Sequence, residues 1–237
     1  MASKAAAERI GKGAEHYAIV GHRQEFPAHM PQKKPSLAVI YAVNPFGADH
    51  QSSEHDPSYT PRTIEESPEK YGKRMEEIGL TTPVSSRALN REKVEFALKT
   101  QYVYSAMDSV NVCQFVYGPA WQLLGTSELA DAITAVTGDE TTPGDLLELG
   151  ARRLNLMRAF NAREGLTREQ DTLPKRLFEE PLVGGRSDGV AVDRALFDEA
   201  LETYYEMAGW DSVTGNPTRS TLEDLELGWV ADELQLA

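Results

Sequence analysis

The chain has 237 residues and carries a formal net charge of −13 at neutral pH. Hydrophobic residues make up 41% of it and charged residues 26%, which is typical of a globular chain that forms one large domain or two small ones. The negative charge argues against nucleic acid and anionic membranes as partners, because binding either of them needs a basic protein surface.

Cysteine usage and hydropathy limit the class of protein further. Cys113 is the single cysteine of the sequence, which excludes an intramolecular disulfide and a metal site built from several cysteines of this chain. The first nine residues have no apolar core, and no run of about 18 apolar residues follows, so we expect neither a signal peptide nor a membrane span. A cytoplasmic location is therefore expected.

The first quarter of the chain is expected to alternate between ordered and connecting segments. Alanines and charge spacing predict a helix over 5–17, although two glycines within it disfavour helix. Three prolines over 26–35 indicate an extended connector, and the apolar run 37–43 that follows is expected to be buried, as a strand or as a helix. The polar segment 44–61 holds two histidines and three acids, too much chemistry for a passive linker.

The remainder of the chain is predicted to be mostly helical. Asn90 and Thr142 are candidate N-caps, and Pro143 after Thr142 stands where its missing donor is harmless. Expected helices cover 67–78, 90–107, 127–136, 142–165, 193–207 and 221–225. Strand-like alternation is scarce and no repeat period is visible. The sequence therefore predicts a mainly α fold, an irregular multi-helix bundle.

Two chemically distinctive residues follow the 90–107 segment. Cys113 ends a hexapeptide that begins with Asp108. Free cysteine is among the most buried residue types, so Cys113 taken alone is expected to be a small buried hydrophobe. A carboxylate five residues before a thiol has no mechanism by itself, so these two residues do not assign a chemistry on their own.

A longer segment carries a family resemblance. Residues 154–176, LNLMRAFNAREGLTREQDTLPKR, resemble the C-terminal domain of the tungsten-containing aldehyde ferredoxin oxidoreductases. Further matches to that family are the tyrosine pair 204–205, the Gly-Trp-Asp turn 209–211, residues 217–218 and the element 222–228. The resemblance covers nearly the whole chain. It implies the irregular helical fold of that family's C-terminal domains, with 1–110 as the end of the second helical domain and 111–237 as the third.

The hexapeptide gains a role from this resemblance. In the family, a motif of Asp, two variable residues, Gly, Leu and Cys contacts a pterin through its aspartate and ligates a cubane iron-sulfur cluster through its cysteine. The resemblance therefore implies Asp108 as a pterin contact and Cys113 as a metal ligand of a [4Fe-4S] cluster. Val112 and Gln114 are implied to add backbone contacts to the cofactor.

The motif departs from the family pattern at two positions. Asn111 stands where glycine is usual, and Val112 replaces leucine. Glycine permits a left-handed turn or a close backbone approach. Both departures therefore concern the turn between the aspartate and the cysteine.

The polar segment resembles a second family feature. Gly47-Ala48-Asp49-His50 is similar to a stretch near the metal whose histidine is proposed to assist proton transfer in aldehyde oxidation. An imidazole suits that task because its pKa lies near neutrality and the attack of water on an aldehyde needs a proton acceptor. His50 is therefore the candidate catalytic residue, with His55 as its competitor and a loop-capping role as the structural alternative. The other histidines, His16, His22 and His29, are expected to be structural.

The missing parts of the family pattern imply an incomplete enzyme. The family binds its cluster through four cysteines, and a single thiolate cannot hold a cubane cluster. The chain is thus implied to be the C-terminal portion of such an enzyme, inactive alone. Its tungsten bis-pterin and [4Fe-4S] cluster would be completed by the N-terminal portion as partner, with tungsten or molybdenum left open.

The implied reaction converts an aldehyde and water to a carboxylic acid, with electrons passing through tungstopterin and cluster to ferredoxin. The alternative is a cofactor-free helical scaffold or interaction subunit derived from that fold. A piece of an enzyme is expected to expose an apolar face where the missing domain docks, whereas an independent scaffold should cover that surface with charge.

Overall fold

The computed structural model describes residues 2–22 and 24–236, and nearly all of the regular secondary structure in these residues is helical. The longer helices are α1 (Ala2–Ile10), α2 (Ser36–Val43), α5 (Arg91–Ser109), α6 (Thr126–Thr137), α7 (Pro143–Arg163) and α9 (Arg194–Ala208). The shorter ones are α3 (Pro61–Glu66), α4 (Lys73–Glu77), α8 (Arg176–Glu179), α10 (Arg219–Asp224) and α11 (Gly228–Glu233). Short turns of helix are η1 (Ala14–Tyr17), η2 (Asp56–Tyr59), η3 (Pro68–Gly72), η4 (Arg168–Gln170) and η5 (Gly185–Ser187). The strands β1 (Val20–Gly21) and β2 (Gln24–Glu25) pair antiparallel. The predicted mainly α bundle is confirmed.

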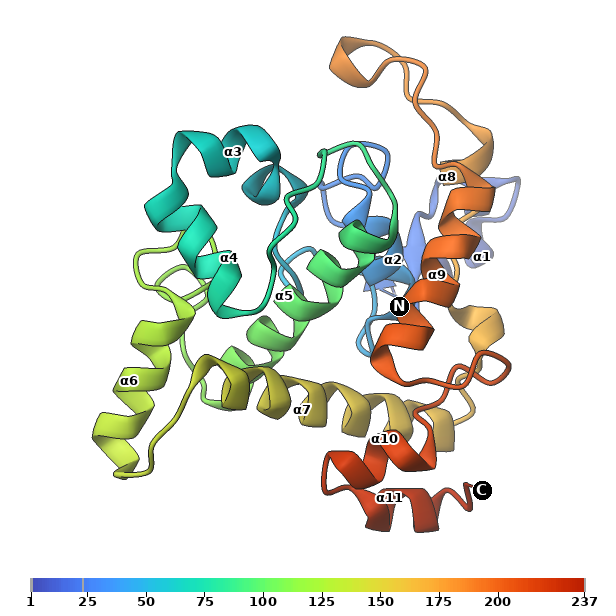
Figure 1. Ribbon diagram of the computed structural model, residues 1–237. Coiled ribbons are helices and arrows are strands. Elements are labelled where there is room, and N and C mark those ends of the chain that lie inside the picture. The colour runs from blue at the N-terminus through green and yellow to red at the C-terminus, as the bar shows by residue number, and fades with distance from the viewer. Residues whose placement is uncertain (1, 23, 237) are drawn as a thin grey trace.

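Helix α5 lies at the centre of the molecule. It packs against α7 most extensively and also against α9 and α2 (Figure 1). The crossing with α7 is close, because a Cβ added at Gly150 would stand 1.8 Å from the carbonyl oxygen of Tyr102. A glycine at this point of α7 therefore sets the distance between the two longest helices.

The N-caps that the sequence indicates are confirmed. The Asn90 side chain accepts from the Lys93 amide at 3.2 Å at the start of α5. Thr142 accepts from the Asp145 amide at 3.2 Å, and the Asp145 carboxylate accepts from the Thr142 amide at 2.8 Å. This reciprocal capping box satisfies two amides that would otherwise lack partners at the start of α7.

Helix α2 settles the open choice between strand and helix. All eight of its residues are buried, so it has no polar side and its sequence shows no helical periodicity. Its N-terminus is held by a residue far along the chain, since the Asp56 carboxylate accepts from the Ser36 amide at 3.2 Å and from the Ser36 hydroxyl at 2.5 Å. Asp56 is in turn ion-paired with Lys93 at 2.8 Å, and both side chains are fully buried. This network ties α2 to α5.

Two expectations about the chain before α5 are wrong in detail. The single helix expected over 5–17 is interrupted, because Gly11 and Gly13 adopt left-handed conformations with φ of 61° and 81°. The helix expected over 67–78 begins earlier, at Pro61 inside the polar segment 44–61, and consists of α3, η3 and α4 in succession, with Thr60 accepting from the Thr63 amide. Proline at the first helical position needs no amide partner, so this start signal was present in the sequence.

The core is divided into three clusters of buried side chains. The largest joins α2, the first half of α5 and α9, and the second joins buried residues between Tyr59 and Val84 with α5, α6 and the start of α7. A small third cluster packs α10 and α11 on Ala159 of α7. Both larger clusters use residues from each side of position 110, and the division of the chain there stays a prediction.

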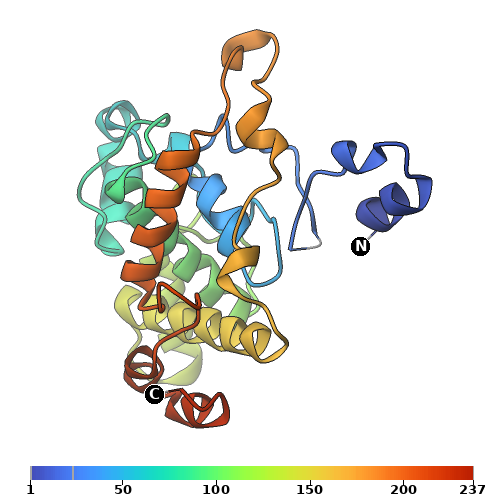
Figure 2. The same ribbon diagram turned by 90° about the vertical axis from the view of Figure 1, so that its right-hand side faces the viewer.

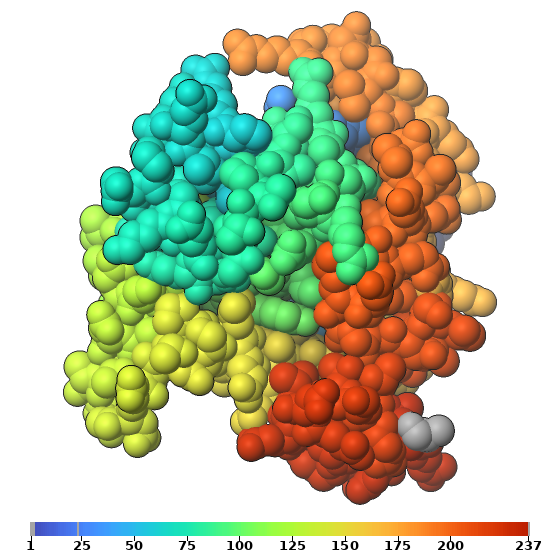
Figure 3. Space-filling view, in the orientation of Figure 1, coloured from blue at the N-terminus to red at the C-terminus, as the bar shows by residue number. Residues whose placement is uncertain are grey.

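Two parts of the chain reach away from this body. The N-terminal arm, with α1 and η1, extends to one side and is connected through the β1–β2 hairpin (Figure 2). The segment around η5 projects beyond α8, and α3–α4 and α9 flank the chain that enters α5 in the space-filling view (Figure 3). Among the described residues, no helix is both long and apolar enough to span a membrane.

Candidate active site

A cavity of about 260 Å³ lies where residues 50–55 of the polar segment meet the chain that follows α5. Its polar side is formed by that segment together with His29, and its apolar side by Tyr104, Phe115 and Trp121. Gln114 also lines it. A small cavity with aromatic walls and a few converging polar groups is the usual form of a small-molecule site.

The loop before His50 is shaped by a tight turn. Gly47 has φ of 100°, and the Asn44 side chain donates to its carbonyl oxygen at 2.8 Å. A Cβ at Gly47 would stand 2.5 Å from the Cβ of Gln24, so the hairpin leaves room for glycine alone. The Asp49 carboxylate accepts from the Gln51 amide at 3.1 Å and thereby orders the next turn. These contacts place His50 at the cavity.

Three histidines surround the polar side of the cavity. The ring of His29 stacks on that of His50 with centroids 4.5 Å apart, and it lies 4.6 Å from that of His55. Lys34 Nζ stands 2.6 Å from His29 Nδ1 and 2.5 Å from His55 Nδ1. His29, expected to be structural, is therefore part of the site, and Lys34 is a member that sequence reasoning missed.

This cluster is not a metal centre of its own. Within residues 2–22 and 24–236, no group of three or more His, Cys, Asp and Glu side chains is arranged to hold a metal ion. Lys34 explains this for the histidines, because its amine occupies the ring nitrogens that two of them would offer to a cation. A charge-bearing amine and a metal ion repel each other at such distances.

Burial and neighbouring charge favour uncharged histidines here. Burial, and then the charge of Lys34, lowers the pKa of His29 to about 4. Burial also lowers the pKa of His50, against the opposing effect of Asp49. The pKa of Lys34 is itself lowered by burial, while Asp56 and Glu54 act against that shift. At neutral pH, His50 is thus an unprotonated imidazole that can accept a proton.

Glu54 anchors the wall behind the histidines. Its buried carboxylate accepts from the Tyr104 hydroxyl at 2.9 Å, from Gln122 Nε2 at 3.1 Å and from the Ser58 hydroxyl at 2.8 Å. Burial, followed by the Glu54 charge, raises the pKa of Tyr104 well above its ordinary value. Sequence reasoning missed this residue, and the only signal was its place among the closely spaced acids of the polar segment.

Two polar atoms of the cavity have no hydrogen-bond partner among the described residues. They are the Ser53 hydroxyl oxygen and His50 Nδ1. The Asp49 carboxylate is 3.9 Å from His50 Nδ1, which is beyond hydrogen-bonding distance. A buried polar group without a partner costs free energy, so these atoms are suited to receive a ligand.

The motif 108–113 forms the C-terminal end of α5. The Val112 amide donates to the Met107 carbonyl at 3.1 Å and the Asn111 amide to the Asp108 carbonyl at 3.3 Å, which is the Schellman arrangement. Asn111, with φ of 57°, occupies the left-handed position. Asparagine tolerates this conformation better than most residues other than glycine. The departure from glycine therefore keeps the turn.

The two ends of the motif are both exposed. The expectation from residue type that Cys113 is buried is wrong, because its thiol lies at the surface just beyond the helix end. Asp108 pairs with Arg153 Nη1 at 3.2 Å and accepts from Gln114 Nε2 at 3.4 Å. The structure thus brings Gln114 and His50 to one cavity, links Asp108 to it through Gln114, and leaves Asp108 and Cys113 outside its lining.

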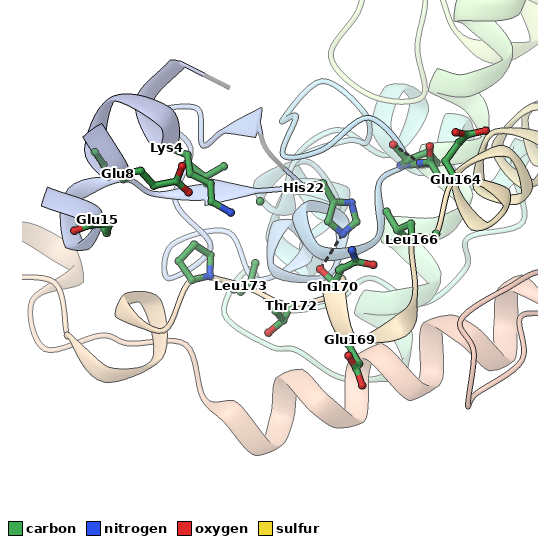
Figure 4. A pocket seen from close by; sticks show the side chains of 18 residues that line it. Lys4, Glu8, Glu15, His22, Glu164, Leu166, Glu169, Gln170, Thr172 and Leu173 are labelled. Atoms are coloured by element: carbon green, nitrogen blue, oxygen red, sulfur yellow. Dashed lines mark hydrogen bonds between the residues drawn. The ribbon is translucent and has the colours of Figure 1, made fainter. Parts of the chain in front are cut away.

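A larger cavity of about 730 Å³ lies between the N-terminal arm and residues 161–174. Its acidic side chains come from separate segments and stand apart around the rim (Figure 4). His22 at its floor is 2.9 Å from the Gln170 carbonyl and 3.3 Å from Asp171, which forms a buried bidentate pair with Arg158. These contacts are structural, and the described side chains of this cavity do not converge on a ligand.

Comparison with known proteins identifies the chain's relatives. The family profile described as aldehyde ferredoxin oxidoreductase, domains 2 and 3, matches residues 1–227. The tungsten-containing aldehyde ferredoxin oxidoreductase of Pyrococcus abyssi is 30% identical over 86% of this chain and 30% of its own length. That of Thermococcus kodakarensis is 27% identical over 92% of this chain and 34% of its own length. The chain therefore spans about a third of the length of the curated relatives it matches.

A solved structure shares the fold. It is described as the active site complex BamBC of benzoyl coenzyme A reductase in complex with 1,5-dienoyl-CoA. The TM-score is 0.74 at 22% identity, and the match covers 98% of this chain and 36% of that one. At this identity the likeness concerns the fold alone.

Proposed function

The chain belongs to the aldehyde ferredoxin oxidoreductase family, and from that premise we propose that it is the C-terminal portion of an enzyme that oxidises aldehydes. The balanced reaction is aldehyde plus water to carboxylic acid, two protons and two electrons. Ferredoxin is the proposed acceptor of those electrons. The N-terminal portion of the enzyme is the proposed partner, since the relatives are about three times as long as this chain.

One observation carries this proposal. Residues about sixty positions apart, His50 and Gln114, line one cavity, and Gln114 directly follows Cys113. The candidate proton acceptor and the candidate cofactor segment are therefore neighbours in space. A helical scaffold without a cofactor has no need of this arrangement or of the unpartnered polar atoms beside it.

The residues present fit the implied cofactors. The exposed Cys113 thiol can be one cluster ligand if the other three come from the N-terminal portion. Asp108 is exposed on the same turn and can accept hydrogen bonds from a pterin, while the backbone of Val112 and Gln114 borders that turn. The bound tungstopterin and [4Fe-4S] cluster would supply the redox chemistry.

This chain's own part in the reaction is proton handling and positioning. His50, unprotonated at neutral pH, accepts the proton that water loses when it attacks the aldehyde carbonyl. The Ser53 hydroxyl can donate to a polar substrate group, and Phe115 and Trp121 offer an apolar wall on the other side. His55 is the less suitable base, because Lys34 and the His50 carbonyl oxygen occupy its two ring nitrogens.

An exposed apolar face lies next to this cavity. Phe115 is 60% exposed, Trp121 45% and Leu123 75%. The rings of Phe115 and Trp121 meet edge to face, with their centroids 5.7 Å apart. Other exposed large apolar residues, such as Val136, do not line the cavity. We assign this face, which we call the 115–123 face, to docking of the N-terminal portion, which favours the enzyme over the scaffold alternative.

Co-expression with the N-terminal portion of a related enzyme, with tungsten supplied, tests the proposal. The co-purified complex is expected to contain iron and tungsten and to reduce viologen when aldehyde is added. Cys113→Ala should lose the cluster iron and at least tenfold in activity, while association persists. Leu123→Asp, on the 115–123 face, should prevent association because it buries a charge.

Val136→Asp is the matched control, since it places the same charge on an exposed position of α6 away from the cavity. It should leave association and activity unchanged. A chain that stays monomeric beside every N-terminal portion tried would instead support the cofactor-free scaffold or interaction subunit. Association with full activity in Cys113→Ala would contradict the cluster assignment.

A further inference from the structure

Lys34 lies beside the three histidines of the cavity, and its amine contacts two of them at once. Its Nζ is 2.6 Å from His29 Nδ1 and 2.5 Å from His55 Nδ1. An ammonium group has three protons to donate and no lone pair, so both ring nitrogens must be acceptors. A neutral imidazole that accepts at Nδ1 carries its proton on Nε2. The geometry thus defines the tautomer of both rings.

A second, independent contact agrees with this assignment for His55. Its Nε2 is 2.9 Å from the carbonyl oxygen of His50, an atom that can only accept. His55 therefore has its proton on Nε2 by two criteria, one from each side of the ring. Through this bond, His55 holds the backbone of the residue proposed as the base.

The carboxylates near Lys34 are bound to other groups, so the amine of Lys34 interacts with the histidines. The carboxylates that act on it are Glu54 and Asp56. Glu54 is already hydrogen-bonded to Tyr104, Gln122 and Ser58. Asp56 is ion-paired with Lys93 and bound to Ser36. Asp49, the remaining acid near the cluster, faces His50 at 3.9 Å and orders its own loop.

We propose that Lys34 is a positioning residue that locks His29 and His55 as neutral Nε2-protonated rings and so keeps His50 oriented and free to accept a proton. His29, stacked on His50 at 4.5 Å, is held uncharged by the same amine. Protonation of any ring in the cluster would place a second positive charge beside the ammonium. The purpose of this role rests on the proposed function, whereas the tautomers of His29 and His55 do not depend on it.

Histidine tautomers in the 237-residue chain test the inference without any cofactor. A ¹H–¹⁵N correlation spectrum of ¹⁵N-histidine-labelled protein at neutral pH shows each ring as two nitrogens. His29 and His55 are expected to show an unprotonated Nδ1 and a protonated Nε2, assigned by single His→Gln variants. In Lys34→Met, His29 should change to a mixture of tautomers, while His55 keeps its Nε2 proton and its Nδ1 resonance moves to that of a free acceptor.

Lys33→Met is the matched control, since Lys33 is the exposed neighbour and should leave all rings unchanged. Lys34→Arg should restore at least the His55 bond. A doubly protonated or Nδ1-protonated His29 in the wild-type chain would overturn the inference, and this outcome is readable even if Lys34→Met does not fold. An unchanged His29 tautomer together with an unchanged His55 Nδ1 resonance in a folded Lys34→Met chain would overturn it as well.

The complemented enzyme supplies a second readout. Loss of the Lys34 charge makes His50 easier to protonate, so the acid limb of the kcat profile should move to higher pH in Lys34→Met and return in Lys34→Arg. Predicted tautomers with no aldehyde activity in any complex would leave the role of Lys34 standing and reject the proposed function. Aldehyde activity in a complex whose histidines show other tautomers would support the proposed function and reject the role of Lys34.

Discussion

At the scale of single residues, the site depends on ionisable side chains that are held uncharged by their surroundings. Burial and the charge of Lys34 lower the pKa of His29 to about 4, and burial lowers that of His50. These histidines are well suited to accept protons because the folded protein disfavours their charged form. The same shift has a cost in stability, which gives the first prediction.

The protein is expected to lose stability between about pH 6.5 and pH 5. Over this range the unfolded chain binds a proton at His29, with an ordinary pKa of 6.5, and the folded chain does not, so the free energy of unfolding falls as the pH falls. The partly exposed ring limits the effect to about 1 kcal/mol. Urea midpoints at the two pH values measure it.

His29→Gln should reduce this pH dependence, and His16→Gln, at an exposed histidine, should not. Glu25, whose pKa is lowered to about 2 mainly by hydrogen bonds from Ser3, loses its stabilising charge only below pH 4.5 and does not disturb this range. An identical slope in wild type and His29→Gln would show that His29 binds its proton equally well in the folded and the unfolded chain, and would contradict the prediction.

At the scale of elements, the α5–α7 crossing determines how the helices stack. A methyl group at Gly150 of α7 would overlap the Tyr102 carbonyl of α5 at 1.8 Å, so the two backbones would have to separate. The motif 108–113 at the end of α5 depends on the same helix for its place. This crossing thus links the packing of the core with the position of the proposed cofactor residues.

Gly150→Ala is expected to destabilise the protein by about 3 kcal/mol, because the rigid backbone of α5 must move to admit it. Gly144→Ala is the matched control in the same helix, since its Cβ would meet only the Thr142 hydroxyl at 3.4 Å. Better helix propensity should make that variant neutral or more stable by up to about 1 kcal/mol. Equal effects of the two substitutions on the denaturant midpoint would contradict the close crossing.

At the scale of the whole molecule, the body and the N-terminal arm contribute unequally to stability. Among residues 3–10 of α1 only Ala7 is buried, and η1 has no buried residue. The Ser3 amide donates to Glu25 at 2.8 Å, which connects the arm to the hairpin. At the other end, α10 and α11 bury Leu222, Val230 and Ala231 against α7.

Deletion of residues 1–17 is therefore expected to change the free energy of unfolding by less than about 1 kcal/mol, because little apolar surface becomes exposed. Deletion of residues 219–237 is the comparison and should cost several kcal/mol, since each lost buried side chain contributes about 1.5–3 kcal/mol. Urea denaturation of both truncated chains measures this. A larger loss from the arm than from the C-terminal helices would contradict the burial seen here.

Features that rest on local chemistry could be predicted from the amino-acid sequence. The caps Asn90 and Thr142 marked the starts of α5 and α7, because capping involves residues three positions apart. The family resemblance and the mainly α fold followed from linear patterns as well. Such patterns could not decide whether residues 37–43 form a strand or a helix, because a helix buried on all sides has no hydrophobic periodicity.

The assembly of the site depends on tertiary packing. His29, Lys34 and Glu54 join His50 because α2 packs on α5 and the segments that flank α2 meet beside Tyr104 of that helix. The exposure of Cys113 likewise follows from where the Schellman turn ends α5. Tautomers and charge states depend on distances across such packing, and sequence spacing does not contain those distances.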